Sequence, residues 1–332
     1  MNDAYEAYLE RALQEVPEGT FAVEQHNAAD AGKPLMTEQF TARTRGKGKI
    51  ERFLLFPGIE LSLHQYLAEQ VQFHHKPKDA VLEINHCRRG RIGWNMHDGA
   101  AVYLGAGDLC LHSLASCADS QMALPLGYYE GIAVTVDLRE LDKSCPSILQ
   151  EAGFEAKKIY QKFCVEEAPF GVPSNSTIDS IFSPLYNLPR HLRVPYYKLK
   201  ALEALLYLLR LEPGAVKGLT QYGSRQTELV KEIRNFLVQH LDQRFTIEQL
   251  ARKYLLNTSS LKTVFKTVYG MPIASYVKEY RMQQAMKLLR ETDDSIARIA
   301  EKVGYETQGK FTKAFKEQRQ ILPTEYRKLY RK

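Results

Sequence analysis

The chain has 332 residues, 44% hydrophobic and 25% charged, a composition that excludes an intrinsically disordered protein and predicts two or three globular domains. Its net charge of +6 is unevenly placed: residues 225–332 hold 22 basic and 12 acidic residues, whereas residues 1–224 hold 23 basic and 27 acidic ones. A basic terminal third on an acidic body is typical of a protein with one domain that binds a polyanion.

Residues 1–49 predict a short amphipathic helix followed by a polar connector. The chain begins with acidic residues where a secretory signal needs basic and then apolar ones. Its most apolar run, residues 201–211, is far shorter than the roughly 20 apolar residues that span a membrane. We therefore expect a soluble, cytoplasmic protein without a membrane partner.

Residues 50–140 change to a pattern of short strands separated by turns. Apolar residues recur at alternate positions, at Leu61, Leu63 and Leu67 and again at Ile132, Val134, Val136 and Leu138. Such spacing places one side of each strand on a core. Several short strands bounded by glycine-containing turns predict a small antiparallel β sandwich or barrel.

Residues 141–213 predict a helical segment, and residues 214–224 predict a polar, glycine-containing linker. The strongest helix starts near Pro195 and carries an apolar stripe, which consists of Leu199, Leu202, Leu205, Leu206 and Leu209. Two interpretations remain open. The stripe packs on the β domain of its own chain, or two such helices bury each other in a dimer.

Residues 225–332 predict two helix-turn-helix units in tandem. In the first unit, Thr246 and Asn257 are placed to cap two consecutive helices. The small side chain of Ala251 lets these two helices cross closely. The outward side of the second helix is polar and basic, as a helix in the DNA major groove requires. It consists of Thr258, Ser259, Lys262, Thr263 and Lys266.

A long helix over residues 273–290 leads to a second unit of the same plan. Asp294 or Ser295 caps its first helix, and Gly304-Tyr305 forms the turn. Its second helix, residues 307–318, buries two phenylalanines. The exposed residues of that helix are predicted to be Gln308, Gly309, Lys310, Thr312, Lys313 and Lys316.

A set of residues at fixed spacing runs through both units: Ala251, Leu261, Phe265-Lys266, Gly270, Tyr276, Arg281, Ala285, Leu288-Leu289, Ser295-Ile296, Ile299-Ala300, Gly304-Tyr305, Phe311, Phe315-Lys316, Pro323 and Tyr326-Arg327. Through these positions, residues 225–330 resemble the DNA-binding domain of the AraC/XylS family of transcription regulators. The resemblance implies that the second helix of each unit enters double-stranded DNA, the two about one helical turn, roughly 10 bp, apart.

The resemblance and the outward faces together indicate which side chains meet DNA. Contacts to base edges are predicted for Ser259, Lys262 and Thr263 in the first unit and for Gln308, Lys310 and Lys313 in the second. Contacts to phosphates, or support of the fold, are predicted for Lys253, Lys266, Arg281 and Lys316.

Two positions depart from the family pattern. Gln320 stands where the family usually has a glycine three residues before the final proline, which predicts a changed end of the second recognition helix. Gly309 stands where the family often has a larger polar residue near the base edges, so the second unit is predicted to be the poorer base reader.

Regulators of this family often place a cupin-like β barrel that holds a small molecule ahead of the DNA-binding domain. The strands between residues 50 and 138 loosely resemble that pattern. Candidates for the effector pocket are chosen because basic and aromatic groups cluster there, and they are Arg88, Arg89, Arg91, Trp94 and His97.

The sequence leaves three alternatives to this interpretation. A metal-dependent cupin enzyme fused to the DNA-binding domain would use histidines such as His64, His86 or His97, but the chain has no His-x-His pair. A DNA-repair alkyl acceptor would need a four-cysteine zinc cluster. No two of the five cysteines have the spacing of a zinc motif. A redox sensor is conceivable at Cys87, because two arginines follow it and could lower the pKa of its thiol.

We therefore predict an α+β multidomain protein, with an N-terminal cupin-like antiparallel β barrel or sandwich with helices and a C-terminal all-α tandem helix-turn-helix domain. The predicted function is a DNA-binding transcription regulator, an activator on family grounds, gated by a small-molecule effector. The predicted partners are DNA, a second copy of the chain and RNA polymerase. No catalytic residue, cofactor or metal is predicted, and a constitutive regulator remains an alternative.

Overall fold

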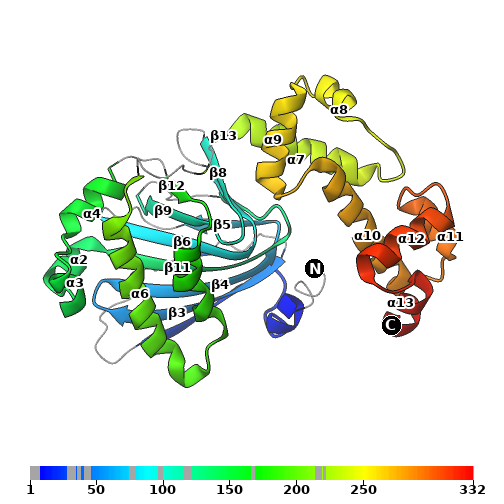
Figure 1. The fold of residues 1–332 in the computed structure, drawn as a ribbon. Coiled ribbons are helices and arrows are strands. Elements are labelled where there is room, and N and C mark those ends of the chain that lie inside the picture. The colour runs from blue at the N-terminus through cyan, green and yellow to red at the C-terminus, as the bar shows by residue number, and fades with distance from the viewer. Residues whose placement is uncertain are drawn as a thin grey trace. The chain divides into compact units, whose positions relative to one another are not determined.

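A computed structural model describes residues 8–27, 35, 39–40, 46–74, 80–95, 100–115, 121–165, 169–213, 219 and 222–331. The chain divides into two compact units, residues 1–224 and 225–332. Within the described ranges, no helix is long and apolar enough to cross a membrane. Figure 1 labels the helices and strands of both units.

The first unit is built on two β-sheets. The larger sheet has the strand order β1 (Phe21–Asn27), β3 (Gly46–Phe56), β4 (Ile59–Ala68), β11 (Tyr128–Asp137), β6 (Val81–Gly90), β9 (Leu109–Ser113) and β12 (Phe170–Val172). The smaller sheet has the order β13 (Tyr222–Gly223), β8 (Ala100–Leu104), β7 (Ile92–Asn95), β10 (Gln121–Ala123), β5 (Gln70–His74) and β2 (Gln39–Phe40). Of these pairings, only β1 with β3 is parallel. The predicted fold class of the unit, an antiparallel β structure with helices, is confirmed.

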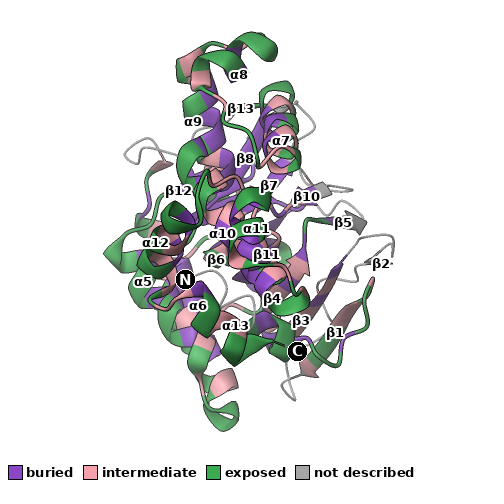
Figure 2. Cartoon of the chain, turned by 90° about the vertical axis from the view of Figure 1, so that its right-hand side faces the viewer, coloured by how far each residue is buried: buried purple, intermediate pink, exposed green. Residues whose placement is uncertain are grey.

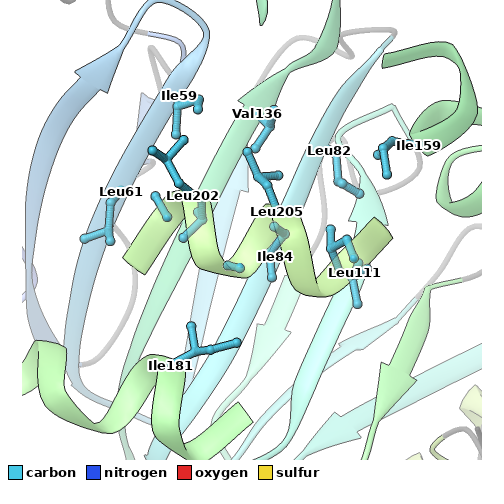
Figure 3. Close-up of a cluster of buried hydrophobic side chains, with 14 of the residues drawn as sticks. Ile59, Leu61, Leu82, Ile84, Leu111, Val136, Ile159, Ile181, Leu202 and Leu205 are labelled. Carbon is cyan, nitrogen blue, oxygen red and sulfur yellow. The ribbon is translucent and has the colours of Figure 1, made fainter. Parts of the chain in front are cut away.

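The alternating apolar residues of β4 and β11 face each other in the sheet. Leu61 lies opposite Val134, and Leu63 lies opposite Ile132. Their side of the sheet is covered by helices, which are α2 (Leu138–Lys143), α3 (Ser147–Glu151), α4 (Ala156–Phe163), α5 (Ser176–Phe182), the 3-10 turn η1 (Ser183–Asn187) and α6 (Arg193–Arg210). A second 3-10 turn, η2 (Arg190–Leu192), leads into α6. The resulting core is shown in Figure 3, where α6 contributes Leu202 and Leu205.

The other side of the large sheet packs on the small sheet. Ile50, Tyr66 and Cys87 of the large sheet share one buried cluster with Trp94 and Met122 of the small one. The large sheet therefore has a helix-facing side and an inner side, and successive residues of each strand alternate between the two.

The predicted segments of residues 1–224 need three corrections. Residues 1–49 are not only a helix and connector, because they contain β1 and the start of β3. The helical residues 141–213 pack on the sheet and belong to the same compact unit. The predicted linker contains Leu219, whose amide donates to the carbonyl of Gly171, and strand β13, which pairs with β8.

The leucine stripe of α6 is mostly used inside its own unit. Leu202 is 7% and Leu205 0% exposed, and Leu206 and Leu209 pack partly buried against the same core. Only Leu199 is largely exposed, at 60%. A dimer contact through the whole stripe is therefore wrong, because four of its five side chains already cover the sheet.

This arrangement predicts unequal effects of two alanine substitutions on α6. Leu205→Ala is expected to lower the free energy of unfolding of the first unit by about 2–5 kcal/mol, because it leaves a cavity under the helix. Leu199→Ala is expected to change it by less than about 0.5 kcal/mol. The fluorescence of Trp94, the one tryptophan of the chain, follows unfolding of this unit in urea. Equal effects of the two substitutions would contradict the assignment.

The second unit consists of helices. They are α7 (Ser224–Gln239), α8 (Ile247–Lys253), α9 (Thr258–Tyr269), α10 (Ile273–Glu291), α11 (Ile296–Lys302), α12 (Gln308–Arg319) and α13 (Pro323–Tyr330). The long helix α10 carries Met282, Ala285 and Leu289 into a core that also holds Phe311 and Phe315 of α12. The predicted all-α tandem helix-turn-helix domain is thus confirmed. Helices α8 and α9 form its first helix-turn-helix, and α11 and α12 form its second.

Candidate nucleic-acid interface

The first helix-turn-helix is fixed by caps and by a small residue at its crossing. Thr246 and Gln249 form a capping box at the start of α8, and the side chain of Asn257 accepts from the amide of Ser260 at the start of α9. Ala251 is 4% exposed, which lets α8 and α9 approach closely. Buried and exposed residues alternate along α9 (Figure 2). Its exposed side contains Ser259, Lys262, Thr263 and Lys266.

The second helix-turn-helix repeats these features. Ser295 caps α11 by accepting from the amide of Arg298, and Thr307 caps α12 by accepting from the amide of Lys310. Phe311 and Phe315 are fully buried. The exposed side of α12 contains Gln308, Gly309, Lys310, Lys313 and Lys316. Both recognition helices therefore present the side chains predicted to meet DNA at the surface.

The two recognition helices end in the same way despite different residues. Gly270 after α9 has φ +78° and Gln320 after α12 has φ +63°, both in the left-handed region. Each donates its amide to a lysine carbonyl of the last turn, Lys266 and Lys316 respectively. The expectation that Gln320 changes the end of the second recognition helix is therefore wrong. Glutamine adopts the glycine geometry there, at a conformational cost.

Gly309 lies in the first turn of α12, where a β-carbon would meet no other atom within 4 Å. Space is therefore open at the position where the family often carries a larger polar side chain. The structure offers no packing reason for glycine at this position.

The residues predicted to contact phosphates or support the fold divide into two groups. The guanidinium of Arg281 donates to the carbonyls of Leu241 at 2.5 Å and Gln243 at 3.0 Å, so it ties α10 to the segment after α7. The ammonium of Lys253 lies 3.3 Å from the centre of the Phe236 ring. These two residues support the fold. Lys266 and Lys316 are exposed in the last turns of α9 and α12, where they remain predicted phosphate contacts.

The described residues of the predicted effector pocket point to different sides of the first unit. Arg88 points to the helix-facing side, where it pairs with Glu130 at 3.1 Å and lies over the Tyr186 ring. Trp94 is buried on the inner side, among residues of both sheets. Arg89 is exposed, Arg91 is half-buried, and His97 lies outside the described residues. Arg88 and Trp94 therefore do not line one pocket, and the role of His97 stays a prediction.

A different polar cluster lies on the inner side of the large sheet, and it was not predicted. Its members form two groups on either side of β11. Register places one group on β3 and β4 and the other on β6 and β9, and they are Arg52, Glu60, Ser62 and His64, and Glu83, Asn85 and His112. The alternation of Glu60, Ser62 and His64 with leucines along β4 was the available signal.

Polar contacts run through this inner cluster. Arg52 lies 3.7 Å from Glu60, and the imidazole of His64 lies 2.7 Å from the Ser62 hydroxyl and 3.0 Å from that of Tyr66. The carboxylate of Glu83 accepts from Asn85 at 2.6 Å. His112 lies 3.7 Å from Glu83, and its ring is 5.9 Å from that of Trp94 on the small sheet.

Two histidines inside the first unit, His64 and the fully covered His86, are held neutral. Burial lowers the pKa of His64 to about 4, and burial lowers that of His86 to about 4 as well. His86 stacks on Phe182, and its Nδ1 lies 2.9 Å from the Tyr186 hydroxyl. Both histidines therefore pack as uncharged side chains in the folded protein.

These pKa values predict a loss of stability in acid. Between about pH 6.5 and pH 4, both histidines take up protons in the unfolded chain but not in the folded chain. The free energy of unfolding therefore falls by about 1.4 kcal/mol per pH unit for each histidine in that window. His86→Gln should remove its share and flatten the dependence of urea unfolding on pH, followed through Trp94. An unchanged pH dependence would contradict the neutral, buried state of His86.

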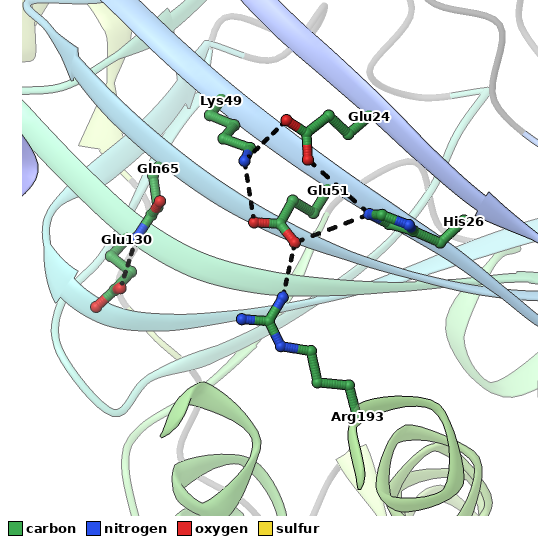
Figure 4. A network of polar contacts seen from close by, with 7 residues as sticks. All are labelled: Glu24, His26, Lys49, Glu51, Gln65, Glu130 and Arg193. Atoms are coloured by element: carbon green, nitrogen blue, oxygen red, sulfur yellow. Dashed lines mark hydrogen bonds and ion pairs between the residues drawn. The ribbon is translucent and has the colours of Figure 1, made fainter. Parts of the chain in front are cut away.

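The geometry supports neither a redox site at Cys87 nor a metal site on β1 and β3. Cys87 is 0% exposed, and burial raises the pKa of its thiol, which disfavours the reactive thiolate. Glu24, His26 and Glu51 lie close enough to one another to hold a metal. However, the ammonium of Lys49 lies 2.9 Å from Glu24 and 3.4 Å from Glu51, and Arg193 lies 2.9 Å from Glu51 (Figure 4). These carboxylates are already neutralised by side-chain cations.

Comparisons with known proteins agree with the geometry of the second unit. Residues 250–329 match the family described as a helix-turn-helix domain. The transcriptional activator RhaR of Mannheimia succiniciproducens is 36% identical over 91 residues, 27% of this chain and 33% of that protein. The TetD protein of transposon Tn10 from Escherichia coli is 31% identical over 110 residues, 32% of this chain and 80% of that protein.

One similarity extends over both units. An uncharacterised helix-turn-helix transcriptional regulator of Haemophilus influenzae is 23% identical over 287 residues, 81% of this chain and 94% of that protein. By contrast, the chain covers only a third of the length of RhaR.

Proposed function

Since this chain belongs to the AraC/XylS family of transcription regulators, we propose that it binds specific DNA sites and activates transcription there, rather than catalysing a reaction. The observation that carries the proposal is the pair of capped recognition helices, α9 and α12, each with a polar and basic exposed side. Helices of this kind enter the major groove with their N-terminal residues at the base edges.

Sequence choice is assigned to the exposed residues near the starts of α9 and α12. They are Ser259, Lys262, Thr263, Gln308, Lys310 and Lys313. Lys266 and Lys316 contact phosphates, which sets affinity and its dependence on salt. Arg281 and Lys253 act inside the fold, as their contacts with Leu241, Gln243 and Phe236 support.

The proposed effector site is the inner polar cluster of the first unit. Arg52, Glu60 and His112 are each at most 5% exposed. Ionisable side chains are rarely buried this deeply. Paired as they are here, they offer charged and hydrogen-bonding groups that a polar ligand can engage between the two sheets. An effector bound there would alter DNA binding by the second unit through a coupling free energy of about 1–3 kcal/mol. The protein acts as a homodimer that contacts RNA polymerase, as expected of an activator.

Selection of genomic fragments by the purified full chain at physiological salt tests the proposal. We expect an enriched motif of two short blocks about one helical turn, roughly 10 bp, apart. The genes beside the enriched sites supply candidates for the effector. Fragments recovered without any common sequence, with and without those candidates, would contradict a sequence-specific regulator.

A further inference from the structure

The turn of the second helix-turn-helix is one residue longer than the turn of the first. The first helices of the two units correspond at a spacing of 49, since the caps are Thr246 and Ser295 and the left-handed turn residues are Leu255 and Gly304. The recognition helices correspond at a spacing of 50, since their caps are Asn257 and Thr307. The extra residue between Tyr305 and the cap Thr307 is Glu306.

The side chain of Glu306 binds two cations of the second unit. Its carboxylate forms an ion pair with Lys310 in the first turns of α12, and its other oxygen lies 3.3 Å from the guanidinium of Arg244. The position of α9 that corresponds to Lys310 is Ser260. The first helix-turn-helix therefore lacks both the added carboxylate and the lysine that pairs with it.

This ion pair contributes little to stability, because all three side chains are exposed and water screens their attraction. Glu306 directly precedes the cap of α12, and the residues at the start of a recognition helix lie nearest the base edges. A carboxylate there repels phosphate oxygens, and it also reduces the positive charge that Lys310 and Arg244 offer to the DNA backbone.

We infer that Glu306 is a specificity-determining residue of the second helix-turn-helix, an inference that rests on the proposed binding of specific DNA. Its carboxylate accepts a hydrogen bond from a cytosine amino group in the major groove. It also keeps Lys310, which the proposed function places at the base edges, and Arg244 from contacting DNA wherever that amino group is missing. The second helix-turn-helix thereby gains selectivity for DNA sequence in spite of Gly309. It does so through a residue of its turn rather than through a residue of α12.

Glu306→Gln in the full chain tests this inference, with Glu301→Gln as a matched control. Glu301 is an exposed glutamate of α11, so both variants lose one negative charge. Binding is measured at several salt concentrations to three duplexes: the selected site, the site with its second block changed, and random DNA. Glu306→Gln should bind random DNA more tightly than the control. The slope of log affinity against log salt should steepen by about 0.9 for each cation freed.

Discrimination should change at one block only. Glu306→Gln should lose about tenfold of its preference for the intact second block and none of its preference for the first. Adding Lys310→Ala to Glu306→Gln should return the salt slope toward the wild-type value. If Glu306→Gln matches Glu301→Gln in slope and preference while the wild type keeps its preference, this inference is overturned and the proposed function stands. If the wild type prefers no sequence, both are overturned.

Discussion

Gly304→Ala is expected to destabilise the second unit by about 2–5 kcal/mol. Gly304 has φ +78°, and a β-carbon there would collide with the carbonyl oxygen of Leu241 and with the guanidinium of Arg281. The backbone would have to move at the point where Arg281 ties α10 to the segment after α7. Urea unfolding followed by far-ultraviolet circular dichroism measures the change, while Trp94 fluorescence reports on the first unit.

Two matched substitutions separate the collision from a general effect of glycine. Gly309→Ala makes the same change in α12, where the space is open, and should stabilise the unit by about 0.5–1 kcal/mol. Leu255 occupies the position equivalent to Gly304, with φ +53° and 93% exposure. Leu255→Gly should therefore be neutral or stabilising by up to about 1 kcal/mol, because it relieves the left-handed conformation of leucine. A Gly304→Ala protein as stable as the wild type would refute the assigned close packing.

The double substitution Lys262→Ala with Thr263→Ala is expected to weaken binding to the selected DNA site by about 10- to 100-fold or more, and binding to random DNA much less. Both side chains are exposed on α9, and each contact to a base edge contributes about 1–3 kcal/mol of discrimination. Titration of the full chain with labelled duplexes at fixed salt gives both affinities.

A control for charge is needed because the double variant also loses one cation. Lys302→Ala removes an exposed lysine from α11, and it should lower both affinities slightly and equally. If the α9 variant also lost both affinities equally, its side chains would contact only phosphates, and the assignment of base readers to α9 would fail.

The second unit could be predicted closely because its signals are local. Helix caps such as Thr246, Asn257 and Thr307 act within three residues, and Gly270 and Gly304 mark positions where the backbone turns left-handed. The pairing of Lys253 with Phe236 joins residues 17 positions apart in sequence (253 − 236), and no periodicity reports such a contact. The role of Lys253 therefore depended on a three-dimensional neighbour.

The first unit was harder to predict because its pairings are long-range. The strands with alternating apolar residues were recognised, but β1 contains Glu24, Gln25 and His26, so it resembles a polar connector until it pairs with β3. Equally, a leucine stripe has the same periodicity whether it covers its own sheet or a partner. The burial of Leu202 and Leu205 settles that question for most of α6.

The candidate effector residues show a second limit. Arg88 and Trp94 are near in sequence, but strand alternation and the end of β6 send them to opposite sides of the large sheet. The inner cluster instead gathers Arg52, His64 and His112 from three separate strands. Only the register of the strands brings these side chains together.

Hydroxyl-radical footprinting of the full chain on its selected site tests the central claim most directly, that both helix-turn-helix units bind one DNA duplex. We predict two protected stretches on one face of the duplex, about one helical turn or roughly 10 bp apart, with the Lys262→Ala and Thr263→Ala changes weakening the stretch bound by α9. A single protected stretch, or equal protection along the whole duplex, would contradict the account.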